Sequence, residues 1–124
     1  MKKIISTTNA PAAVGPYSQA VMYGDMLYTS GQIGLDPATG AFAGDDIATQ
    51  AKQVCENLKA VLAEAGMTFD NVIKTTCFLA EISDFAAFNA IYADYFVSRP
   101  ARSCVAAKDL PKGALCEIEV IAAK

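Results

Sequence analysis

The sequence predicts an α+β fold of two layers, in which two helices pack on one face of a mixed β-sheet. Short β-rich segments open and close the chain, and two segments of helical period lie between them, separated by one more β-rich segment. The resulting order, β-β-β-α-β-α-β-β, is typical of a sheet that carries its helices on one face. A length of 124 residues fits one domain, residues 1–124.

The N-terminal part predicts three strands. Lys2 to Ser6 is a short β-rich run, and Asn9 to Tyr17 cannot be helical because its prolines favour extended geometry in the residues before them. Two further β-rich runs follow, Gln19 to Tyr23 and Met26 to Ser30. They predict a hairpin about Gly24-Asp25, because glycine at the first central position fits a type II′ turn.

After loops expected over residues 30–34 and 36–40, the pattern changes to a helical period. From Asp46 to Ala65, apolar residues recur at i, i+4, i+7, i+8 and i+11 and polar residues occupy the other side. Asp45 and Asp46 favour the start of a helix, and Gly66 favours its end. The segment therefore predicts a long amphipathic helix with one face in the core.

The C-terminal half predicts one more helix between strands. Asn71 to Ala80 is rich in β-branched residues and predicts a strand. Ser83 or Asp84 is expected to cap a helix over Phe85 to Phe96, which ends before Pro100. Its aromatic stripe is interpreted as core: Phe85, Phe88, Tyr92 and Phe96. Two last strands complete the sheet, Ala101 to Ala106 and Leu115 to Ala123, joined by a turn centred between Asp109 and Leu110.

Charge and composition exclude several functions. The net charge is −3 with only ten Lys and Arg residues, so no nucleic-acid partner is expected. The chain contains no histidine, which excludes Ser-His-Asp and Cys-His catalysis and any zinc site with histidine ligands. Hydrophobic residues make up 53 %, and this apolar surplus predicts a closed homo-oligomer with inward-facing sheets.

The four cysteines and the hydropathy indicate a reducing compartment. Cys55, Cys77, Cys104 and Cys116 form no C-x-x-C motif and have apolar neighbours, so they are expected to be free and mostly buried thiols. No signal-peptide core or membrane-spanning apolar run occurs. We therefore expect a cytoplasmic protein without a membrane partner.

Arg102 is the main candidate for a functional side chain. It lies in an otherwise apolar strand, and its planar guanidinium suits bidentate binding of a carboxylate. The alternative is a structural ion pair. If the last two strands form a hairpin about the turn between Asp109 and Leu110, residues whose numbers add up to 219 face each other. Arg102 then faces Glu117. The two interpretations remain open at this point.

Other candidates are weak individually. Tyr17 follows Gly15-Pro16, which fixes the backbone and aims the phenol, although a tyrosine that closes a loop fits equally well. Ser30 and Gly31 lie at a strand end and offer a hydroxyl and an unobstructed backbone N–H. The alternative is that they form an ordinary glycine turn. Asn89 interrupts the aromatic stripe of the second helix. Most asparagines in such a position simply form a hydrogen bond to a loop.

Several segments together resemble a known family. They are Asn9 to Ala20, Thr29 to Ile33, Val72 to Leu79, Asp84 to Asn89, Pro100 to Val105 (Pro-Ala-Arg-Ser-Cys-Val), Leu110 to Lys112 and Glu117 to Glu119. The chain resembles the RidA branch of the Rid family, the reactive intermediate deaminases, also called YjgF-like proteins. The resemblance covers essentially the whole chain. Departures, such as Gly34 where proline is common, affect the cleft rim.

The resemblance implies a chorismate-mutase-like fold and a homotrimer with three clefts between subunits. It implies hydrolysis of 2-enamine and 2-imino acids, such as 2-aminoacrylate or 2-aminocrotonate, to 2-keto acids and ammonia, without a cofactor or metal. By position, Arg102 binds the substrate carboxylate and Glu117 orients the attacking water. The remaining implied site residues are Tyr17 and Ser30 lining the pocket, backbone groups of Gly31 and Cys104, and Asn89 from the adjacent chain.

This chemistry needs no histidine, because an imine carbon is already electrophilic and one oriented water with a carboxylate suffices. A Cys104 nucleophile is disfavoured because no base or cationic group except Arg102 is evident to lower the pKa of its thiol. A second hypothesis is a trimeric keto-acid or metabolite-binding protein with a regulatory or chaperone-like role and no turnover. A ribonuclease is disfavoured by the acidic balance, and chorismate mutase activity is only a fold-level analogy.

Overall fold

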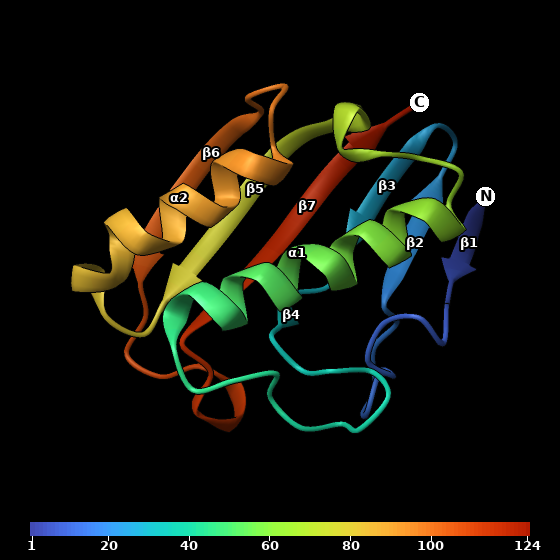
Figure 1. Ribbon diagram of the computed structural model, residues 1–124. Coiled ribbons are helices and arrows are strands. Elements are labelled where there is room, and N and C mark those ends of the chain that lie inside the picture. Colours follow the sequence, from blue (N-terminus) through green and yellow to red (C-terminus); the bar gives the residue numbers. More distant parts are fainter.

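The computed structural model describes residues 1–124 and shows two layers (Figure 1). A seven-stranded mixed sheet has the order β1-β2-β3-β7-β5-β6, with β4 paired to β7 outside this path. The strands are β1 (Lys2–Ile5), β2 (Ala20–Tyr23), β3 (Met26–Thr29), β4 (Gln32–Ile33), β5 (Val72–Leu79), β6 (Ala101–Ala106) and β7 (Cys116–Ala123). The helices are α1 (Ile47–Glu64) and α2 (Phe85–Tyr95).

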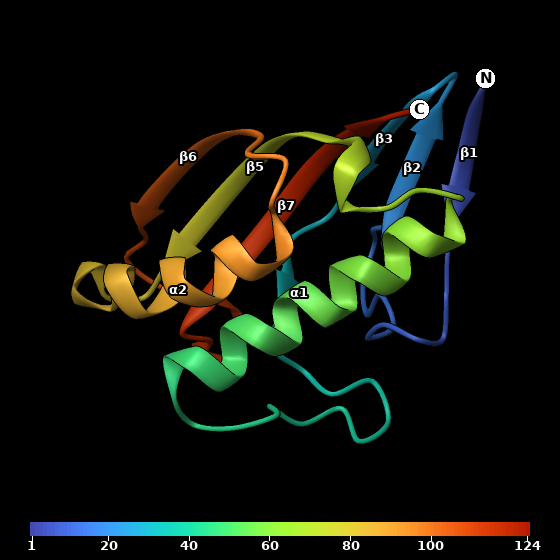
Figure 2. The same ribbon diagram turned by 45° about the horizontal axis from the view of Figure 1, so that its top comes forward.

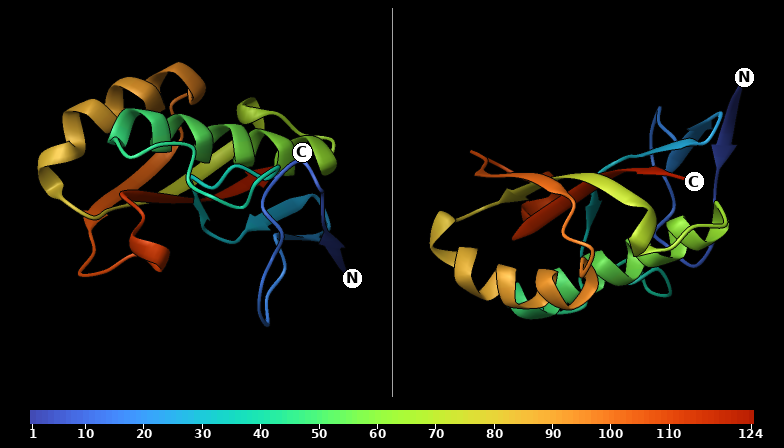
Figure 3. Two further views of the ribbon diagram at one scale, coloured as in Figure 1. Left: turned by 60° about the horizontal axis from the view of Figure 1, so that its bottom comes forward. Right: turned by 90° about the horizontal axis from the view of Figure 1, so that it is seen from above.

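Both helices lie on the same face of the sheet, side by side and running roughly along the strands (Figures 2 and 3). The predicted two-layer α+β architecture with a mixed sheet is therefore confirmed. No helix covers the other face, which is visible when the molecule is seen from above (Figure 3, right). That face remains open in a single chain.

Helix α1 has the bounds and caps that its sequence predicts. The Asp46 carboxylate accepts a hydrogen bond from the Thr49 N–H at 3.0 Å, which satisfies one of the free N–H groups of the first turn. Gly66 adopts φ +73°, the left-handed conformation that ends helices. The apolar stripe is buried against the sheet.

Helix α2 buries most of its aromatic stripe. Phe88, Tyr92 and Phe96 are buried, and the Tyr92 and Phe96 rings stack with centroids 4.2 Å apart. Phe85 differs from the prediction because it is 37 % exposed and lies at the rim. Asp84 is at the N-cap position, but its side chain makes no capping hydrogen bond.

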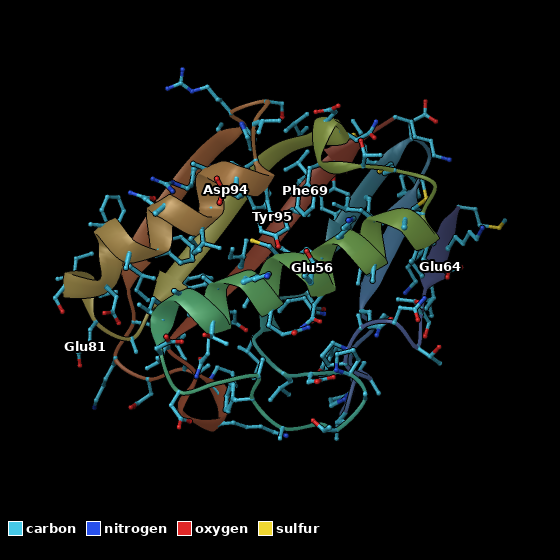
Figure 4. All side chains as sticks on the ribbon, viewed as in Figure 1. Glu56, Glu64, Phe69, Glu81, Asp94 and Tyr95 are labelled. Atoms are coloured by element: carbon cyan, nitrogen blue, oxygen red, sulfur yellow. The ribbon has the colours of Figure 1, made fainter.

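A hydrogen bond joins the two helices. The Tyr95 hydroxyl of α2 donates to the Glu56 carboxylate of α1 at 2.6 Å, and Figure 4 shows the two side chains meeting between the helices. The Phe69 ring packs against Tyr95 with centroids 5.6 Å apart. Burial and the Glu56 charge both raise the pKa of Tyr95, so this phenol remains a donor at neutral pH.

The β2–β3 hairpin confirms its predicted turn. Gly24 has φ +60° while Asp25 has a negative φ, as a type II′ turn requires. Residues 32–33, expected in a loop, instead form β4 and pair with Ile118 and Glu117 of β7. Gly34 ends this strand, and a Cβ there would lie 2.9 Å from the backbone oxygen of Gln50. The glycine lets α1 approach β4 closely.

The predicted hairpin of the last two strands is wrong. β6 pairs with β5 in parallel, and β7 lies on the other side of β5, antiparallel to it. Helix α2 crosses over between β5 and β6, which is the connection that a parallel pair needs. The chain then passes β5 and inserts β7 at the centre of the sheet, where it pairs with β3, β4 and β5.

One hydrophobic cluster of 23 buried residues joins the helices to the sheet. Phe88 is fully buried in it. We expect Phe88→Ala to lower the free energy of unfolding by about 3–5 kcal/mol, because the substitution leaves a cavity. Urea denaturation measures this change. Phe85→Ala, at the rim, serves as the matched control, and an equal loss in both variants would contradict the assignment of Phe88 to the core.

Candidate functional site on two separated surfaces

Arg102 lies on the edge strand β6, beneath helix α2. Its Nη1 donates to the Asn89 side-chain oxygen at 2.7 Å, and its Cζ lies 4.7 Å from the Tyr92 ring centroid and 5.5 Å from that of Phe85. The Tyr92 hydroxyl in turn shares a 2.8 Å hydrogen bond with Thr75. An amide and two aromatic faces therefore hold the guanidinium without neutralising it.

The residues that hold Arg102 share one face of α2. Phe85, Asn89 and Tyr92 are spaced by four and three positions, which aligns them along a helix. Sequence reasoning assigned the two aromatic residues to the core and missed their contact with Arg102. The asparagine within an aromatic stripe was the available signal, because a polar residue at such a position needs a polar partner.

The structure separates Arg102 from Glu117. Arg102 aligns with Thr75, whose partner on β7 is Val120, whereas Glu117 aligns with Phe78. Cys116 and Ile118 on β7 are fully buried under the helices, so Glu117 between them points to the opposite sheet face. The predicted cross-strand pair of Arg102 with Glu117 is therefore wrong. The two side chains lie on different faces of one sheet.

The Arg102 surface carries a pocket of about 490 Å³. Its lining includes Asn89, Tyr92, Arg99 and Arg102. Arg99, which sequence reasoning did not select, has the left-handed φ of +58°, unusual for a residue with a side chain. We call these residues the cationic half-site, since both charged groups that line the pocket are arginines.

Glu117 lines a second pocket, of about 540 Å³, at the end of β7. Burial, and secondarily the nearby charge of Glu119, raise the pKa of Glu117. A Cβ on Gly31 would lie 2.5 Å from the Glu117 carboxylate, so a larger residue at this position would displace the Glu117 side chain. Gly31 therefore shapes the pocket. We call this group the acidic half-site: Tyr17, Ser30, Gly31, Lys112 and Glu117.

Tyr17 and Ser30 are held in place by local hydrogen bonds. The Ser30 hydroxyl donates to the Ser18 carbonyl at 2.6 Å, which leaves its oxygen free to accept. The Tyr17 oxygen accepts from the Val14 N–H at 3.4 Å, and the side chain is 53 % exposed. Lys112, missed as a candidate, enters the same pocket from a 3₁₀ turn with φ +56°.

Cys104 lies on the Arg102 side but lines neither pocket. It is partly buried, and burial raises the pKa of its thiol, although the nearby Arg102 charge acts in the opposite direction. The Cys104 thiol is therefore mostly protonated at neutral pH. All four cysteines are free, and three of them are buried, as the sequence predicted.

Two further findings concern metals and membranes. No group of three or more Cys, Asp or Glu side chains is arranged to hold a metal ion. None of the helices combines the length and the apolar character that crossing a membrane requires.

The fold and the half-sites define a class: a two-layer α+β protein with a cationic and an acidic pocket on different faces of one chain. The family model described as Endoribonuclease L-PSP matches residues 7–124. The chain belongs to this family, the Rid or YjgF-like proteins. The resemblance drawn from its sequence motifs is thereby confirmed.

Individual relatives are similar over their whole length. A 2-iminobutanoate/2-iminopropanoate deaminase of Salmonella typhimurium is 48 % identical over 128 residues, which cover 100 % of this chain and 99 % of the relative. The Rid-family protein YyfA of Yersinia pestis is 51 % identical, with a TM-score of 0.97 and full coverage of both chains. The structure of E. coli TdcF with bound serine is 43 % identical, with a TM-score of 0.94 and 98 % coverage of both.

Proposed function

We propose that the chain hydrolyses 2-imino acids and their enamine tautomers to 2-keto acids and ammonia. The observation that carries the proposal is the guanidinium of Arg102, which is half-buried and bound to an amide and two rings without a carboxylate partner. Such a cation favours a small anionic ligand. Relatives of similar length named 2-iminobutanoate/2-iminopropanoate deaminase support this chemistry.

We propose further that the working site forms between two copies of the chain. A substrate whose carboxylate is bound by Arg102 cannot also reach Glu117 of the same chain, because the sheet lies between these two side chains. The open sheet face exposes about half of Tyr28, Ile73 and Val105, and such apolar surface is usually covered. A homotrimer with inward-facing sheets would cover it and bring the cationic half-site of one copy to the acidic half-site of the next.

The proposed reaction uses each half-site once. Arg102 binds the substrate carboxylate bidentately and orients the C=N carbon. The Glu117 carboxylate accepts a proton from the water that attacks this carbon, forming a tetrahedral carbinolamine. Because the imine nitrogen is protonated before attack, the carbinolamine is neutral, and the same carboxyl group returns its proton to the nitrogen. The carbinolamine hydroxyl then gives its proton to the Glu117 carboxylate as the C=O bond of the keto acid forms and the C–N bond breaks, releasing ammonia. The raised pKa of Glu117 suits a group that must both accept and donate a proton.

A coupled assay tests this function. A PLP-dependent threonine or serine dehydratase releases the unstable enamine, and we expect added protein to accelerate the appearance of keto acid. The rate should rise with the amount of protein at a constant dehydratase concentration. Heat-denatured protein is the control. A keto-acid rate equal to that of the dehydratase alone would reject the proposal.

A second candidate is a metabolite-binding protein without turnover. The relative TdcF with bound serine favours it, because a small amino-acid ligand fits a cation such as Arg102 without chemistry. Glu117 distinguishes the two functions, since a carboxylate binder gains nothing from a second carboxylate beside its ligand. We expect no nucleic-acid substrate, because the net charge is −3.

The pH profile gives a further prediction, on Glu119. As a base, Glu117 must be ionised, so activity is present above its pKa and falls as the pH drops through it. Because the Glu119 charge raises that pKa, Glu119→Gln should move the acidic limb of the kcat profile to lower pH. The exposed Glu64 at the far end of α1 (Figure 4) supplies the control Glu64→Gln, which should leave the limb unchanged. An acidic limb that stays in place in Glu119→Gln would contradict the role of Glu117.

A further inference from the structure

Two cysteines are direct neighbours in the sheet. Cys77 of β5 and Cys104 of β6 are register partners in a parallel ladder. Both side chains face the helices, and the two thiols are close enough for each to alter the pKa of the other. Neither the fold nor the proposed reaction requires two thiols at this place, because β5 and β6 are already joined by their backbone ladder.

The backbone spacing suits a covalent link. Neighbouring strands lie about 4.8 Å apart, which is within the Cα–Cα range of about 4.4–6.8 Å found in disulfides. Side chains of a parallel pair point in nearly the same direction, so their Cβ atoms stay farther apart than the ideal for a disulfide. A bond here would therefore be strained, and strained disulfides are the readily reduced ones.

The two thiols differ in exposure. Cys77 is fully buried, as are Cys55 and Cys116, whereas Cys104 on the edge strand is partly exposed. A small oxidant therefore meets Cys104 first, and the thiol beside it in the ladder is Cys77. This arrangement of an accessible thiol beside a buried partner is that of an attacked and a resolving cysteine.

We propose that Cys77 and Cys104 are a modification site, at which a peroxide produces a reversible disulfide. The Cys104 thiolate attacks one peroxide oxygen and becomes a sulfenic acid, while the other oxygen leaves as hydroxide and takes up a proton to form water. The Cys77 sulfur then attacks the sulfenic sulfur, and a second water leaves. Two thiols lose two electrons and one hydrogen peroxide is reduced to two waters. The bond lies on the strand that carries Arg102, two residues away.

The rate of this oxidation should depend on pH and on Arg102. Burial raises the pKa of Cys104, so the thiolate is scarce at neutral pH and its amount grows about tenfold per pH unit. We expect the rate to rise correspondingly between pH 7 and pH 8. Arg102→Gln removes the charge that lowers this pKa and should slow oxidation severalfold.

The experiment treats the full chain with hydrogen peroxide under denaturant-free conditions. Expected results are the loss of two hydrogens in the intact mass, a fall from four free thiols to two, and a peptide containing Cys77 linked to one containing Cys104. Dithiothreitol should reverse all three. These readouts do not depend on turnover, so they remain informative whether or not the deaminase assay succeeds.

Two variants make the test specific. Cys104→Ser changes a partly exposed side chain by one atom and should abolish the cross-link. Cys116→Ala, the matched control, removes another thiol of the same sheet face and should retain the cross-link. Oxidation of Cys104 to sulfinic acid without loss of two hydrogens, a bond between other cysteines, or a bond between copies would each overturn the proposal.

Discussion

Arg102→Ala is expected to lower kcat/KM for imino-acid hydrolysis by about a hundredfold to ten-thousandfold. In the proposed reaction the guanidinium supplies two charge-assisted hydrogen bonds to the substrate carboxylate, each contributing about 1.5–3 kcal/mol. A loss of 1.36 kcal/mol corresponds to a factor of ten in rate. The dehydratase-coupled assay measures the change, and titration with a stable 2-keto acid should show a matching loss of affinity.

Two control variants separate the effect of positive charge from that of side-chain geometry and position. Arg102→Lys keeps the positive charge but loses the planar fork, so its activity should lie between wild type and Arg102→Ala. Arg99→Ala removes the other arginine of the cationic half-site, and we expect a much smaller effect because Arg99 is exposed and lacks the aromatic cradle. Activity in Arg102→Ala near that of wild type would reject Arg102 as the carboxylate-binding residue.

The stability of Arg102→Ala should change much less than its activity. The substitution breaks no ion pair, because the side-chain hydrogen bond of Arg102 goes to the neutral Asn89. The free energy of unfolding of Arg102→Ala should therefore change by only about 1 kcal/mol. A collapse of stability together with activity would instead indicate a structural role.

Glu117→Gln is expected to lower kcat by about a hundredfold or more while keto-acid binding stays nearly constant. The amide keeps the size of the side chain but cannot accept a proton, and general-base catalysis contributes about 10²–10⁴-fold. Isothermal titration and the coupled assay measure the two properties separately. Equal losses in binding and turnover would favour the binding protein without turnover.

The matched experiment mixes Arg102→Ala and Glu117→Gln chains by joint unfolding and refolding. If a cleft takes Arg102 from one copy and Glu117 from the next, a random mixture restores both residues in about one quarter of the clefts. We therefore expect about one quarter of wild-type activity from two nearly inactive variants. A site within one chain would show no recovery.

Local signals in the sequence predicted most elements of the fold. The bounds of α1 follow from its apolar period, from Asp46 at the N-cap and from Gly66 at the end, all of which act within a few residues. The β2–β3 turn follows from Gly24 for the same reason. Strand β4 was missed because two residues are too short for a period-two pattern, and only pairing with β7 makes them a strand.

The site residues were predicted as types, but their arrangement was not. Tyr17, Ser30 and Glu117 line one pocket and Asn89 and Arg102 another, which no spacing in the sequence distinguishes. The predicted Arg102–Glu117 pair assumed that consecutive strands are neighbours. That assumption failed because β5, nearly thirty residues earlier in the chain, lies between β6 and β7.

The sequence by itself determined the helices, most strands, the free thiols and the family, because each depends on local backbone preferences or on recognisable motifs. The tertiary structure alone decided the strand order, and with it the separation of the Arg102 pocket from Glu117. Strand order is set by which apolar faces can be buried together over long distances in the chain, and β7, with alternate residues fully buried, takes the centre. For this reason Arg102 and Glu117 of one chain line two separate pockets, and the site we propose requires two copies of the chain.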